Sequence, residues 1–187
     1  MIVIRKMSSK RLGKYACLEL ERRYLLRELP SDLAEQANGW LIVDRYLVDT
    51  RLRLRRMIEM ESGKIVFKFG QKYRASSQNG VETTMTNMYL DEEEFDCLSK
   101  LEVREIVKRR YRYVNGGLEY GIDVFEGELE GLILAEIEFE TEQECERLQT
   151  PVFSLREVTD DIFFTGGFLS KLTREEFEAG LAKRLYE

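Results

Sequence analysis

The sequence predicts an α+β protein whose centre is a closed antiparallel β-barrel with a charged interior and flanking helices. Three observations lead to this prediction. Polar and apolar residues alternate over at least six segments, which is the period of a strand with two different faces. The charges on the polar faces are sorted by sign from one segment to the next. Some of these segments are separated by short stretches that begin like helices.

The alternating segments are predicted strands. The first, 18–23, has an acidic polar face, whereas the second, 51–55, has a basic one. The turn-like stretch 61–64 joins the second strand to a further basic strand, 64–69, so this pair is expected to form a hairpin. Further strands are predicted at 81–86, 107–111, 122–124 and 135–140.

The sorting of charge argues against a sheet face that simply lies in water. Solvated faces usually mix Lys with Glu, because like charges on neighbouring strands destabilise a sheet. Two cations about 7 Å apart repel by roughly 2 kcal/mol at an effective dielectric constant near 20. Several such pairs would offset much of a typical stability of ~5–15 kcal/mol. A closed or strongly curved sheet resolves the repulsion by enclosing a polyanion and a divalent metal. An open sheet with one solvated face is the alternative.

Four stretches carry a helix start signal, in which an N-cap residue precedes a glutamate by three positions. They begin at Asp32, Asp91, Thr141 and Thr173. If the polar strand faces point inward, these helices cover the apolar outer faces. The 187 residues contain two prolines and no low-complexity stretch, so one domain, 1–187, is expected, with 1–12 as a flexible or edge segment.

Composition excludes several classes of protein. The chain has no histidine, which rules out Ser-His-Asp and Cys-His catalysis and His-ligated zinc. Three widely spaced cysteines, Cys17, Cys97 and Cys145, are expected to be reduced, buried thiols. Without a signal peptide or a bilayer-length apolar run, a cytoplasmic protein with no membrane partner is expected. The net charge of −6 argues against a nucleic-acid partner.

Five motifs follow one another over roughly the first 170 residues. The first is Glu19-Leu-Glu21-Arg-Arg23, and the second joins Asp44-Arg-Tyr46 to the basic run 50–56. The others are Phe67-Lys68-Phe69, Lys108-Arg-Arg110-Tyr111 and the long stretch 122–139, which is the most specific. In this order they resemble the CYTH superfamily of triphosphate tunnel metalloenzymes, whose signature ExExK is similar to the first motif.

The resemblance implies an antiparallel barrel of about eight strands that forms a tunnel for a triphosphate and for Mg²⁺ or Mn²⁺. It places the metal-binding carboxylates at Glu19, Glu21, Asp123, Glu136 and Glu138. It places the phosphate-binding cations at Arg51, Arg53, Arg55, Lys68, Lys108 and Arg110. Hard divalent cations prefer carboxylate oxygens, and Arg with Lys suits a bent chain of phosphates. The catalytic candidates are Glu21, Arg23, Tyr46 and Glu138.

Two departures from the family pattern bear on function. Arg23 stands where the family has lysine, and arginine does not give up its proton, so it can act only as a fixed cation. Gly121, Thr84 and Thr86 stand where relatives carry more acidic residues, which points to one metal site rather than two, or to a different substrate preference.

The resemblance implies metal-dependent hydrolysis of a triphosphate, with inorganic tripolyphosphate as the first candidate. The expected partner is thus a small-molecule triphosphate, and the chain is expected to be a monomer or homodimer. An adenylate cyclase that forms cyclic AMP and pyrophosphate is one alternative, because this fold hosts both chemistries. A non-catalytic module that binds nucleotide or polyphosphate and a purely structural α+β domain are the others.

Overall fold

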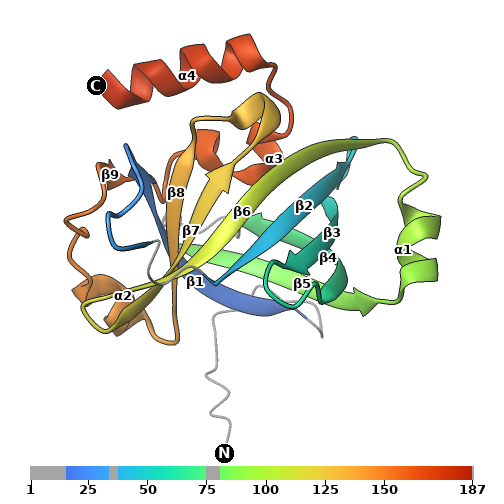
Figure 1. Ribbon diagram of the computed structural model, residues 1–187, viewed down its shortest axis with the longest axis horizontal. Coiled ribbons are helices and arrows are strands. Elements are labelled where there is room, and N and C mark those ends of the chain that lie inside the picture. The colour runs from blue at the N-terminus through green and yellow to red at the C-terminus, as the bar shows by residue number, and fades with distance from the viewer. Residues whose placement is uncertain (1–15, 34–37, 75–80, 187) are drawn as a thin grey trace, which may run out of the picture.

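The computed structural model describes residues 16–33, 38–74 and 81–186. Within these residues, eight antiparallel strands form one ring in the order β5-β4-β3-β2-β6-β7-β8-β1, and β1 pairs with β5 to close it (Figure 1). The predicted closed barrel is therefore confirmed. The strands are β1 (Cys17–Leu26), β2 (Gly39–Leu47), β3 (Leu52–Glu59), β4 (Ile65–Arg74), β5 (Glu82–Leu90), β6 (Val103–Asn115), β7 (Leu118–Phe125) and β8 (Ile133–Phe139). A short ninth strand, β9 (Arg156–Glu157), pairs with the second half of β1.

The helices begin where the capping signals predict. Asp91 caps α1 (Glu92–Leu98) and Thr141 caps α2 (Glu142–Arg147), each accepting a hydrogen bond from the backbone N–H three residues on. Thr173 accepts a similar bond from Glu176 at the start of α4 (Arg174–Tyr186). The fourth predicted helix, from Asp32, falls partly on residues outside the described ranges, as does the segment 1–12.

The outer faces of the barrel are apolar and are covered, as expected. On the β3–β4 side, Leu54 is fully buried, and Phe67 packs against Phe95 of α1 with ring centroids 4.5 Å apart. On the β1, β7 and β8 side, Tyr24 and Ile122 belong to a second buried cluster, against which residues 148–153 pack. Because the outside is apolar, the charged faces point into the barrel.

One end of the barrel interior is apolar, which the sequence did not predict. Leu25, Ile106, Phe125 and Leu134 share the inner face with the charged residues two positions away, and they form a buried cluster with C-terminal side chains. The buried ones are Val158, Phe163, Phe164, Leu169 and Phe177. Three of them lie in residues 162–171, here called the plug. The plug comprises the 3-10 helix η3 (Ile162–Phe164), α3 (Gly166–Leu169), and Ser170 and Lys171.

Two expectations are corrected. In 81–86 the inward residues are Thr83 and Met85, not Glu82, Thr84 and Thr86. Threonines occupy both faces there, so alternation does not fix which face points inward. Cys17 and Cys97 are exposed, and only Cys145 is buried as predicted. No helix in the described part of the chain is long and apolar enough to cross a bilayer.

Candidate functional site

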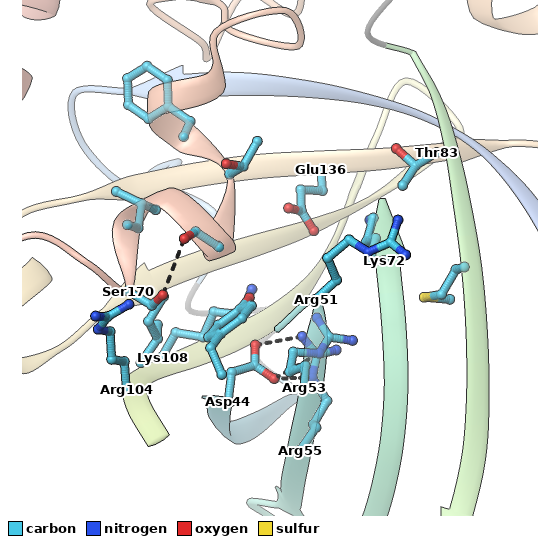
Figure 2. Close-up of a pocket in the computed structure, with 18 of the residues that line it drawn as sticks. Asp44, Arg51, Arg53, Arg55, Lys72, Thr83, Arg104, Lys108, Glu136 and Ser170 are labelled. Carbon is cyan, nitrogen blue, oxygen red and sulfur yellow. Dashed lines mark hydrogen bonds and ion pairs between the residues drawn. The ribbon is translucent and has the colours of Figure 1, made fainter. Parts of the chain in front are cut away.

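The barrel encloses a cavity of about 1040 Å³ (Figure 2). Its lining contains ten cations and six carboxylates, a surplus of four positive charges, although the whole chain carries a net charge of −6. Positive charge is therefore concentrated in an enclosed space within an acidic protein. Such a site attracts an anion, because low-dielectric walls focus the field of the charges inside.

The structure brings nearly all of the predicted site residues to this cavity. Those that line it are Glu19, Glu21, Arg23, Tyr46, Arg51, Arg53, Arg55, Lys68, Lys108, Arg110, Glu136 and Glu138. Figure 2 shows several of them converging from different strands. Asp123 lies behind the lining rather than on it.

Asp123 is fully buried and holds two of the cations. Arg110 donates to both of its carboxylate oxygens at 2.6 Å, and Lys108 donates to Oδ2 at 2.5 Å. Arg110 also donates to Glu136. Both oxygens of Asp123 are thus occupied by cations, which is the environment of a residue that positions Lys108 and Arg110 rather than that of a metal ligand.

Asp44, on β2, does the same for two cations of β3, and sequence reasoning did not select it. Arg55 donates to its two oxygens at 2.5 and 2.7 Å, and the Arg53 Nε lies 3.5 Å from Oδ1. Burial alone would raise the pKa of Asp44, but the charges of Arg55 and Arg53 outweigh it and hold the pKa below its usual range. The sequence did contain one indication of this role, because Asp44 is a charged residue in the strand Gly39–Leu47, which is otherwise chiefly apolar.

The acidic side of the cavity contains a cation that was also missed. Lys72 Nζ lies 2.7 Å from Glu21 and 3.2 Å from Glu19. Burial lowers the pKa of Lys72, but the carboxylates, Glu21 foremost, raise it above its usual value. Lys72 continues the alternation of Lys64 and Lys68 along β4, so the pattern contained this residue.

The family resemblance implies a divalent metal, and the carboxylates in the cavity are suitable ligands for one. Among the described residues, no three Asp, Glu or Cys side chains converge closely enough to form a ready-made metal site. Glu19 and Glu21 nevertheless share one cation, Lys72, and Mg²⁺ commonly uses one or two carboxylates together with substrate phosphates. Burial and the negative charge of Glu19 raise the pKa of nearby Glu138, as expected where carboxylates crowd together without enough positive charge. The residues present therefore fit a hard divalent cation at Glu19 and Glu21.

Arg23 is tied to the C-terminal segment. Its Nη1 donates to the Phe164 carbonyl at 2.7 Å and its Nη2 to the Thr159 carbonyl at 3.3 Å, while its buried Nε has no hydrogen-bond partner among the described residues. That Nε lies 3.7 Å from Glu21. The position at which the family has lysine thus anchors the plug beside the cavity.

Tyr46 lies between the cations and the plug. It is opposite Arg53 in the β2–β3 pair, and its hydroxyl occupies the space that a side chain on Gly166 would need. Burial and the charge of Asp44 raise its pKa, so the phenol keeps its proton and can donate a hydrogen bond. Arg104, Ser170 and Lys171 also line this part of the cavity, and nothing in the alternation of the first strands indicated them.

The fold of the chain is similar to that of solved structures of another protein. Two structures of the protein NE1496, described in one case as a hypothetical protein and in the other as an inorganic triphosphatase, are similar to the chain. The first is 24% identical with a TM-score of 0.58, covering 83% of this chain and 99% of its own. The second is 23% identical with a TM-score of 0.55, covering 81% and 93%. The chain has the same fold as NE1496.

This shared fold agrees, at the level of architecture, with the resemblance drawn from the sequence motifs. No protein-family model and no curated protein matches the chain. The activity therefore has to be argued from the residues of the cavity.

Proposed function

We propose that the chain is a metal-dependent triphosphatase that hydrolyses a terminal phosphoanhydride bond, with inorganic tripolyphosphate as its simplest substrate. The observation that supports this most is the surplus of four positive charges in an enclosed cavity. The cations are also held in place by buried carboxylates before any ligand arrives, as Asp44 and Asp123 demonstrate. Preorganised cations stabilise the charge that spreads over phosphate oxygens in phosphoryl transfer.

In this proposal the side chains of the cavity bind the triphosphate, orient the attacking water and accept its proton. Arg53, Arg55, Lys68, Lys108 and Arg110 hold the phosphate oxygens. Glu19 and Glu21 hold Mg²⁺ or Mn²⁺, which would neutralise phosphate charge and polarise the reacting phosphoryl group. Glu138 lines the same space and forms no ion pair with any described residue, so it is available to take the proton of the attacking water. Tyr46 orients that water.

The bond changes are those of a simple hydrolysis. The water oxygen forms a bond to the terminal phosphorus, and the bridging P–O bond breaks. The products of tripolyphosphate are orthophosphate and pyrophosphate, and the released proton passes to Glu138. No histidine is needed, because positioning and charge stabilisation do most of the work in this chemistry.

The test is phosphate release from tripolyphosphate with Mg²⁺ or Mn²⁺. We expect activity to require the metal, to stop on addition of EDTA, and to fall at least ~100-fold in Glu21→Gln and in Arg53→Ala. Arg109→Ala is the matched control, since Arg109 faces outward from β6 and pairs with Glu126 on the surface. Activity that survives EDTA and both substitutions would contradict the proposal.

A non-catalytic binding module is the second candidate, and one observation favours it. Arg23, at the position of the family lysine, donates to two carbonyl groups and is committed to the plug. Calorimetry separates the two functions, because a binding module takes up tripolyphosphate without releasing phosphate under any metal condition.

A further inference from the structure

The cavity has more room than a triphosphate needs. Pockets for drug-sized ligands measure about 300–1,000 Å³, and this cavity of about 1040 Å³ lies at the upper end of that range. The cations and carboxylates assigned to the triphosphate above come from the barrel strands. The rest of the cavity lies toward the plug, and the chemistry of its lining determines what else a ligand can carry.

The plug side of the cavity is lined by polar groups from three segments. The loop after β2 contributes Asp49 and Thr50, the start of β6 contributes Arg104, and the plug contributes Ser170 and Lys171. These segments are neighbours, because Tyr46 pairs with Arg104 across β2 and β6 and its hydroxyl abuts Gly166. Figure 2 shows Arg104 and Ser170 on the same side of the cavity, with Lys108 next to them.

Arg104 and Lys171 differ from most cations in the cavity. Asp44 holds Arg53 and Arg55, Asp123 holds Lys108 and Arg110, and two glutamates hold Lys72. Neither the Arg104 guanidinium nor the Lys171 ammonium forms an ion pair or hydrogen bond with any residue in the described ranges, although the backbone N–H of Lys171 donates to the Phe168 carbonyl. In the part of the chain that the structure describes, only one carboxylate, Asp49, lines the cavity on this side. The plug side therefore offers two cations whose donors are not committed to the protein.

Most apolar side chains here offer little surface to a ligand, and Ile162 of the plug, which is 62% exposed, is the exception. Ile106, Phe164 and Leu169 line the cavity, yet they are only 4%, 1% and 1% exposed. An uncharged ring placed against them would gain little apolar burial. The free donors on this side suit an anionic group better.

We propose that Arg104 and Lys171 bind a further phosphate group, so that the preferred ligand of this cavity is an inorganic polyphosphate with more than three phosphates. This inference rests on the proposed function, since it assigns the substrate class of the same site. A fourth phosphate reaches the uncommitted donors of Arg104 and Lys171, whereas the base and sugar of a nucleoside triphosphate do not satisfy them.

The test is calorimetric titration of the full chain, without added divalent metal, with tripolyphosphate, tetrapolyphosphate and ATP. Two additional contacts between exposed charges correspond to roughly twofold to thirtyfold tighter binding of tetrapolyphosphate than of tripolyphosphate. In the double variant Arg104→Ala with Lys171→Ala, that ratio should fall to near one. Arg109→Ala, on the outer face of β6, should keep it.

The outcomes separate this inference from the proposed function. Binding of tripolyphosphate with no preference for tetrapolyphosphate overturns the inference and leaves the proposed function standing. A double variant that keeps the wild-type ratio, or tighter binding of ATP than of tetrapolyphosphate, also overturns it. Absence of tripolyphosphate binding overturns both. Arg104 and Lys171 are exposed, so the double variant should fold, which its far-ultraviolet circular dichroism will verify.

Discussion

At the scale of single residues, the site depends on carboxylates that never meet the ligand. Asp123 and Asp44 are 0% and 2% exposed, and a buried charge is tolerated only when it is paired. Each of them holds two cations, and this fixes guanidinium and ammonium groups on the cavity wall before a phosphate arrives. The cost of ordering these long side chains is thus met during folding rather than during binding.

The substitution Asp123→Asn tests this role directly. The amide has the same shape but no charge, so Lys108 and Arg110 are left close together without their shared anion. We expect the free energy of unfolding to fall by about 3–5 kcal/mol, the usual effect of breaking a buried pair, as measured by urea denaturation. Glu119→Gln, which breaks an exposed pair with Arg112 between the same two strands, should cost about 0–1 kcal/mol. Equal effects of the two substitutions would contradict this role of Asp123.

The sequence located most of the charged residues of the cavity but not their partners. Alternation showed that Asp123, Lys108 and Arg110 point inward, because a strand has a period of two. It could not show that Asp123 lies directly opposite Arg110, because strand pairing depends on register across the β6–β7 hairpin. For the same reason, alternation could not show that Asp123, which is predicted to bind metal, pairs with Lys108 and Arg110.

At the scale of elements, the plug determines the shape of the cavity. A Cβ added to Gly166 would lie 1.9 Å from the Tyr46 hydroxyl oxygen, a separation that no real structure tolerates. Glycine is therefore required at this position so that α3 can approach β2 closely. The next residue, Gly167, has nothing within 4 Å of the corresponding position and provides a matched control.

We expect Gly166→Ala to displace Tyr46 or the plug, whereas Gly167→Ala leaves both in place. Displacement of a positioned group by about 1 Å can cost about 100-fold in rate, so kcat/KM for tripolyphosphate should drop by one to two orders of magnitude in Gly166→Ala alone. The measurement is steady-state phosphate release by both variants. Loss of activity in both variants, or in neither, would show that the contact between Tyr46 and Gly166 does not shape the site.

The plug could not be predicted because its signal is not periodic. Seven of the eight barrel strands and three helices follow from alternation and capping boxes, which are local features of sequence, whereas β2 does not alternate. In residues 162–171 neither feature is present, since apolar residues flank a pair of glycines. The apolar positions Leu25 and Leu134 on the inner face were visible, but what covers them depends on contacts with residues more than 25 positions away.

At the scale of the whole molecule, the charges are distributed unevenly. The chain has a net charge of −6, while the cavity lining carries four positive charges in surplus, so the acidic residues predominate elsewhere. Internal carboxylates pair with the crowded cations and so stabilise the barrel while they are ionised. Its stability is therefore expected to depend on pH at the acidic end of the range.

The sign of this dependence follows from Asp44. Its folded-state pKa is held below the usual value despite burial, because Arg55 and Arg53 surround it, whereas in the unfolded chain it titrates near about 3.9. A lowered folded-state pKa gives stability that is fully present above the unfolded pKa and is lost as pH falls toward the folded one. We expect the free energy of unfolding to be nearly constant from pH 7 to about 5 and then to fall by up to about 1.4 kcal/mol per pH unit for each such group.

Urea denaturation at a series of pH values measures this fall in the free energy of unfolding. The variant Asp44→Asn shows how much of the fall is due to Asp44. The variant cannot titrate at that position, so it should be less stable at pH 7 and should lose less additional stability below pH 5 than the wild type. Asp161, held below its usual pKa by Arg184 despite partial burial, continues to contribute in both proteins. A variant whose stability falls as steeply as that of the wild type would show that the acid sensitivity arises outside the cavity. In that case, protonation of Asp44 among its cations would not be what destabilises the barrel at low pH.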